Sequence, residues 1–86
     1  MRSTLVTSAS RIGRYLGAAR SEAGITQAEL AERAGISRTW LIYFEAGKKR
    51  RAQMDVVFRV IHALDCELVI QPKRPSAFDI EALVGR

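Results

Sequence analysis

The sequence predicts a mainly α-helical domain of four to five short helices, followed by one short β-strand near its carboxyl end. Between residues 8 and 64, apolar residues recur at helical spacing and glycines stand where helices would end. The stretch CELVIQ, residues 66–71, is instead rich in Leu, Val and Ile, too short for a helix, and followed by Pro72. A chain of 86 residues fits a single domain with one small core.

The composition indicates a partner that carries negative charge. The chain has 14 Lys and Arg against 9 Asp and Glu, which gives a net charge of +5 and a pI of about 10.1. Such a balance attracts polyanions, for example nucleic acid or an acidic membrane surface. Because 48% of the residues are hydrophobic, we expect the chain to fold rather than to remain disordered.

The sequence lacks the features of a membrane protein, a metalloprotein or an enzyme. No apolar run approaches the roughly 18 residues of a membrane helix, and the first residues lack the apolar stretch of a signal peptide, so we expect a cytoplasmic protein. Cys66 cannot form an internal disulfide, and the single His62 cannot assemble a zinc cluster within one chain. With no nucleophile–base arrangement and no phosphate-cradling glycine loop, we predict no enzyme activity, metal site or cofactor.

The first two helices have clear start and stop signals. The first is expected over residues 8–23, with Gly24 as its stop, and its apolar stripe consists of Ile12, Leu16 and Ala19. Thr26 stands three residues before Glu29, which predicts a capping box in which each side chain bonds an unpaired backbone N–H. The second helix is therefore expected from Gln27 to about residue 34.

A glycine-containing turn joins the second helix to the third. Gly35 can adopt the positive φ that a tight helix exit requires, and Ser37 can cap the next helix. Leu41 and Phe44 lie three residues apart on one face of that helix, whereas Ala31 is small where the two helices would come close. Two short helices joined in this way form a helix-turn-helix unit.

After Gly47 the pattern predicts an exposed basic connection, a fourth helix and the strand. The fourth helix is expected to bury a stripe of Met54, Val57, Phe58, Ile61 and Leu64. A lone strand needs a neighbour for its backbone groups, and a second copy of the same strand would hide both edges in a two-fold dimer. The predicted dimerisation residues are Cys66, Glu67, Leu68, Val69, Ile70 and Gln71. The alternatives are pairing with TLVT, residues 4–7, or an unpaired edge.

The stretch ITQAELAERAGISRTWLIYFEAGKKR resembles the helix-turn-helix of the XRE/Cro-like repressor family. The resemblance includes the GxT-Q-x-x-L-A opening, with Ile25 as its variable position, and the E-x-G-K ending at residues 45–48, and it covers about residues 12–64. It implies a lambda-repressor-like fold whose third helix enters the DNA major groove. It also implies an ion pair between Glu45 and Arg20, which we interpret as structural.

The resemblance assigns DNA-binding roles to exposed residues of the second and third helices. Arg38 can donate two hydrogen bonds to guanine, Thr39 can contact a base or a thymine methyl, and Tyr43 can reach a base edge or a phosphate. Trp40 is expected mainly to pack beside the helix. The predicted DNA-contacting residues are Gln27, Ser37, Arg38, Thr39, Ile42, Tyr43, Lys48, Lys49, Arg50 and Arg51. The plain alternative is that these are solvated surface residues.

The carboxyl end resembles that of HipB-like antitoxins, whose strands pair across a dimer. That resemblance implies operator binding, autoregulation of an operon and a HipA-like serine/threonine kinase toxin as partner. We therefore expect a DNA-binding domain over residues 1–65, a dimerisation strand over 66–72 and a tail over 73–86 with a short helix from Ser76. In the tail, a partner or the dimer body would contact Phe78, Ile80, Leu83 and Val84. The alternatives are a frayed tail, a stand-alone XRE-type or phage-like regulator, or a protein-interaction module that binds no operator.

Overall fold

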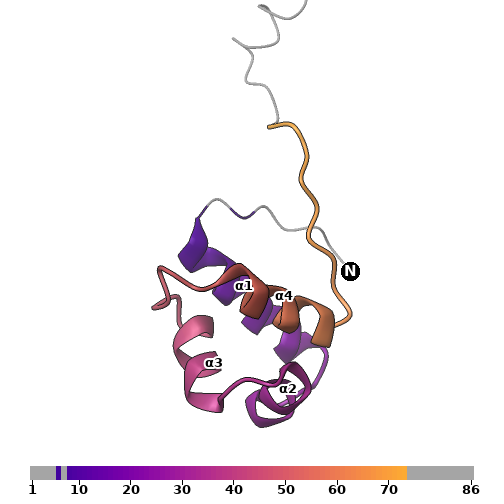
Figure 1. Cartoon of the computed structure of the whole chain (residues 1–86). Helices are drawn as coiled ribbons and strands as arrows, with labels where there is room; N and C mark the ends of the chain where they lie inside the picture. The colour runs from indigo at the N-terminus through magenta and orange to yellow at the C-terminus, as the bar shows by residue number, and fades with distance from the viewer. Residues whose placement is uncertain (1–5, 7, 74–86) are drawn as a thin grey trace, which may run out of the picture.

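The computed structural model describes residue 6 and residues 8–73 and contains four α-helices in that part of the chain. Their bounds are α1 Ala9–Glu22, α2 Gln27–Ala34, α3 Arg38–Glu45 and α4 Met54–Ala63 (Figure 1). The helix α3 packs against both α1 and α2, and α4 packs against α2. The predicted mainly α-helical fold is thus confirmed. None of the helices described is long and apolar enough to cross a membrane.

The core lies between the four helices and is built from aliphatic side chains and one phenylalanine. Its largest fully buried side chains are Phe44, Leu30, Leu41, Val57 and Val60. Ile36 and Trp40 are partly buried and pack against this cluster. Burial of these side chains is the main force that holds four short helices together, because none of them is long enough to be stable alone in water.

The buried stripe of α4 differs from the predicted one. Met54 and Phe58 are exposed, whereas Val60, which the sequence analysis did not select, is completely buried. One residue advances a helix by roughly 100°, so Phe58 lies a quarter turn or more away from the face that Val57 presents to α2. Met54 is the first residue of α4 and lies at the end of that face. The prediction was therefore wrong for these two positions.

Two glycines let α1 approach α3 closely. A Cβ atom on Gly13 would overlap the carbonyl oxygen of Phe44, and one on Gly17 would lie 3.0 Å from the side chain of Glu45. Both glycines are buried on the same face of α1 because they are four residues apart. The sequence analysis missed this pair, although two glycines at helical spacing inside a predicted helix are a detectable signal of close packing.

The turn between α2 and α3 forms as the sequence predicts. Gly35 ends α2 in the left-handed conformation with φ of 67°, and its N–H donates to the carbonyl of Glu32. The hydroxyl of Ser37 then accepts a hydrogen bond from the backbone N–H of Trp40 at 3.0 Å. These two signals fix the direction in which α3 leaves the turn.

Beyond α4 the chain runs away from the helical body as an arm, residues 66–73 (Figure 1). The chain turns at Asp65, whose φ is 58°, and the apolar side chains of Leu68, Val69 and Ile70 are exposed. No strand is assigned in the residues that the structure describes, so the β-strand and its pairing across a dimer stay predictions. The predicted tail helix and its four apolar residues lie outside the described residues.

Candidate nucleic-acid interface

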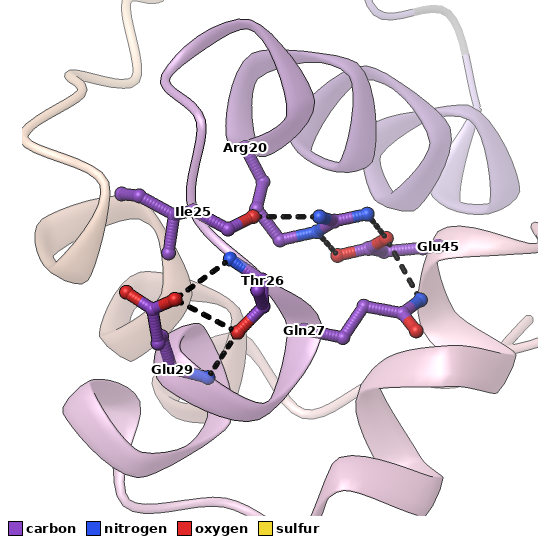
Figure 2. A network of polar contacts seen from close by, with 6 residues as sticks. All are labelled: Arg20, Ile25, Thr26, Gln27, Glu29 and Glu45. Carbon is purple, nitrogen blue, oxygen red and sulfur yellow. Dashed lines mark hydrogen bonds and ion pairs between the residues drawn. The ribbon is translucent and has the colours of Figure 1, made fainter.

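An ion pair joins the end of α1 to the end of α3. Arg20 Nε donates to Glu45 Oε2 at 2.7 Å, and Arg20 Nη2 donates to Glu45 Oε1 at 2.9 Å (Figure 2). The remaining nitrogen, Nη1, donates to the carbonyl oxygen of Ile25 at 2.7 Å. The pair that the family resemblance implies is therefore present. Its side chains are only 17% and 8% exposed, so it is a largely buried, two-point contact.

The hydrogen bond from Arg20 to Glu45 raises the pKa of Arg20 above its ordinary value, although burial acts in the opposite direction. Arginine is already protonated throughout the accessible pH range, so the guanidinium stays charged. The pair consequently acts as a fixed connection between α1 and α3, independent of pH as far as Arg20 is concerned.

Gln27 is a third member of this network. Its side-chain nitrogen Nε2 donates to Glu45 Oε1 at 3.1 Å, which ties the first residue of α2 to the last residue of α3 (Figure 2). The capping box beside it also forms, with the backbone N–H of Glu29 donating to the Thr26 hydroxyl at 3.1 Å. The amide of Gln27 carries two N–H groups, and the bond to Glu45 uses one of them. The sequence analysis did not foresee the contact between Gln27 and Glu45.

The outer face of α3 exposes the residues that the sequence analysis selected. Leu41 and Phe44 are buried against the helical body. The exposed positions on the opposite side are Arg38, Thr39, Ile42 and Tyr43. Of these, Tyr43 is 48% exposed and Ile42 is 40% exposed. Ser37 is exposed as well, but its hydroxyl oxygen serves the helix cap.

The basic loop, residues 48–51, folds back along α3. The ammonium group of Lys48 lies 5.9 Å from the centre of the Tyr43 ring, and that of Lys49 lies 5.8 Å from the Trp40 ring. Trp40 in turn stacks on Phe44, with ring centroids 4.8 Å apart. These distances are within the range in which a cation is attracted to an aromatic face. The contacts therefore hold Lys48 beside the outer face of α3 and Lys49 beside Trp40, which the sequence alone did not indicate.

The positive charge of this region is not neutralised by nearby carboxylates. Within residues 8–73, the ion pair between Arg20 and Glu45 is the one contact of an arginine or lysine with a carboxylate within 4.0 Å. Arg38 and the basic loop therefore present free charge next to a protruding helix. Such an arrangement offers hydrogen-bond donors to base edges and cations to phosphates.

The comparisons with known proteins support the fold. The fold is similar to that in a structure titled as a HipB-O1-O2 complex, with a TM-score of 0.74, 20% sequence identity, and coverage of 81% of this chain and 100% of the other. It is also similar to a structure titled "MDT Protein", with a TM-score of 0.74, 19% identity, and coverage of 84% and 100%. No curated protein matches the sequence significantly. The family described as "Helix-turn-helix domain" matches residues 11–69, so this chain belongs to the helix-turn-helix domain family.

Proposed function

We propose that this chain is a sequence-specific DNA-binding repressor that inserts α3 into the major groove of its operator. The observation that carries the proposal is the outer face of α3, where exposed polar side chains and an un-neutralised basic loop adjoin each other. A protruding helix of this kind fits the major groove of B-form DNA, and the loop that follows lies where the phosphate backbone would pass.

Within this proposal, the residues of α3 have separate roles. Arg38 at the start of the helix pairs with guanine O6 and N7, and Thr39 contacts a neighbouring base. Tyr43 reaches a base edge or a phosphate through its hydroxyl, and Ile42 offers an apolar contact to a thymine methyl. The second N–H of the Gln27 amide and the basic loop hold phosphates, which gives affinity and register but no sequence choice. If each protomer neutralises about 3 to 5 phosphates, the log-affinity of a dimer falls against log salt with a slope of about −5 to −9.

We also propose that the protein acts as a two-fold dimer joined through the arm. Residues 66–71 pair with the same residues of a second copy, and the two edges then satisfy each other's backbone groups. The exposure of Val69 and Ile70, 69% and 94% in the single chain, supports this proposal because apolar side chains in such a row favour burial.

The more specific biological role that we propose is that of an antitoxin. The protein would bind an operator upstream of its own gene and form a complex with a HipA-like serine/threonine kinase toxin. What supports this role is the similarity of the fold to that in a HipB structure. A pull-down with the kinase encoded beside this gene would test it, and unchanged capture by a chain lacking residues 76–86 would contradict docking of the tail on the toxin.

Operator recognition is tested first by binding to the upstream promoter duplex and to a scrambled duplex at physiological salt. We expect selective binding by the wild type, and a loss of about tenfold to a hundredfold for Arg38→Ala on the promoter only. The matched control is Arg59→Ala. Arg59 is also an exposed arginine, but it belongs to α4 and is not among the residues proposed to contact DNA. Equal, weak binding to both duplexes by the wild type would contradict sequence-specific recognition.

A further inference from the structure

One arginine of α1, Arg14, lies at the start of the basic loop, outside the surface described so far. A Cβ atom placed on Gly47 would lie only 2.6 Å from Arg14 Nε and 3.3 Å from the carbonyl oxygen of Ser10. The guanidinium of Arg14 therefore lies against the residue that directly precedes the basic loop. In Figure 1 the amino-terminal part of α1 and the connection from α3 to α4 lie on the same side of the molecule.

Arg11, Arg14 and Tyr15 together line an open hollow of about 290 Å³ on the surface of α1. The two arginines are exposed, and Tyr15 is half-buried. Neither arginine has a carboxylate partner within 4.0 Å among the residues that the structure describes. The hollow thus combines two uncompensated guanidinium groups with one phenolic hydroxyl, all of which can donate hydrogen bonds to an anion.

The packing of α1 fixes this hollow relative to α3. Arg11, Arg14 and Tyr15 occupy adjacent positions on the surface of the helix because they are three and four residues apart. Gly13 and Gly17 lie on the buried face, where they hold α1 tightly against Phe44 and Glu45 of α3. The hollow therefore lies on a helix that is packed tightly against α3. This packing fixes the distance between the hollow and the outer face of α3.

We propose that Arg11, Arg14 and Tyr15 form a phosphate-binding site for the DNA backbone beside the groove that α3 enters. The site extends the basic loop onto α1, so that one strand of the duplex can run from Arg50 and Arg51 across Gly47 to the hollow. Arginine is suited to this role because its planar donors match the geometry of a phosphate. The proposal rests on the DNA-binding function proposed above and adds a contact from a helix outside the helix-turn-helix.

The test compares two variants that remove the same charge from different places. One is Arg11→Gln combined with Arg14→Gln, and the control is Arg33→Gln combined with Arg59→Gln, which changes exposed arginines of α2 and α4. Binding to the promoter duplex and to a scrambled duplex is measured over a range of salt concentrations. For the first variant we expect the slope of log-affinity against log salt to be less steep by about 2 per protomer. Two phosphate contacts are lost, and each contributes about 0.9 to that slope. Affinity should fall by the same factor for both duplexes.

Failure of the proposed phosphate site and failure of the proposed DNA-binding function would give different results. Selective binding by the wild type with an unchanged slope in the α1 variant would overturn the site and leave the repressor function intact. A wild type that binds neither duplex would overturn both. A lysine pair, Arg11→Lys with Arg14→Lys, keeps the charge and should restore the slope. If both α1 variants lose helical circular dichroism at the assay temperature while the control does not, the arginines are structural and the proposal is wrong.

Discussion

Arg20 and Glu45 form a two-point ion pair that joins the last turn of α1 to the last residue of α3, with N–O distances of 2.7 and 2.9 Å. Gln27 donates to the same carboxylate from the first residue of α2. The carboxylate of Glu45 therefore connects three helices: α1 through Arg20, α2 through Gln27, and α3, to which it belongs. The stability of the domain and the placement of α3 depend on the same contact.

We predict that Arg20→Ala lowers the free energy of unfolding by about 2 to 4 kcal/mol, because it leaves the Glu45 carboxylate largely buried and without its cation. Urea denaturation followed by circular dichroism measures the change. Arg20→Lys keeps the charge but loses the second hydrogen bond, so its effect should be smaller. Equal stability of Arg20→Ala and the wild type would contradict the structural role of the pair.

The close approach of α1 and α3 predicts a severe effect from one methyl group. Gly13→Ala should lower the free energy of unfolding by about 1 to 3 kcal/mol, although alanine favours helix, because Cβ would overlap the Phe44 carbonyl oxygen. That oxygen accepts a hydrogen bond from Gly47 N–H at 3.0 Å, so its displacement also disturbs the start of the basic loop. Gly17→Ala meets only the side chain of Glu45 and should be milder. Thermal unfolding distinguishes them, and a stabilised Gly13→Ala would show that the helices are further apart.

The contact between Lys48 and Tyr43 predicts an order of affinities among Tyr43 variants. Tyr43→Phe keeps the ring beneath the lysine but loses the hydroxyl, so affinity for the promoter should fall by a few-fold to about tenfold. Tyr43→Leu loses the ring as well, and its affinity should be about two- to fivefold lower than that of Tyr43→Phe. Fluorescence anisotropy with a labelled duplex gives the values. If the phenylalanine and leucine variants bind alike, the ring does not help to place Lys48.

We predict that removal of the arm abolishes dimerisation without unfolding the helical domain. A chain ending at Asp65 should keep α1 to α4 folded, since the buried core residues from Leu16 to Leu64 are all retained. It should sediment as a monomer in analytical ultracentrifugation, whereas the wild type should sediment as a dimer. Val69→Pro, which removes one backbone donor from the arm, should shift the equilibrium in the same direction. A monomeric wild type at micromolar concentration would refute pairing through the arm.

Much of the fold could be predicted from the sequence, because its signals are local. The capping box at Thr26, the turn at Gly35 and the cap at Ser37 each depend on residues within a few positions of one another, and each has formed. The buried positions of α3 followed from spacing alone. For α4, the same reasoning selected Phe58 because it is apolar, although the face that α2 covers excludes it.

The relationships that could not be predicted connect residues far apart in the chain. Nothing near Gln27 indicates that its amide bonds to Glu45, eighteen positions away, because that contact depends on how α2 and α3 cross. The lysine–ring contacts depend on the path of the basic loop, and so does the approach of Gly47 to Arg14. Pairing of the arm would need a second chain, and it stays a prediction.

The arm also has a consequence for the lifetime of the protein. Beyond Cys66, whose N–H donates to the carbonyl of Ile61, residues 67–73 of the arm form no backbone hydrogen bond with another residue that the structure describes. Exposed backbone without such bonds enters the extended binding cleft of a protease readily, and we expect limited digestion of a dilute sample to cut there first, leaving the helices intact. Assembly would protect the same peptide bonds. If the proposed dimer forms, each protomer would expose its own degradation site until a partner covers it, and the rate of turnover would depend on how much of the protein remains unassembled.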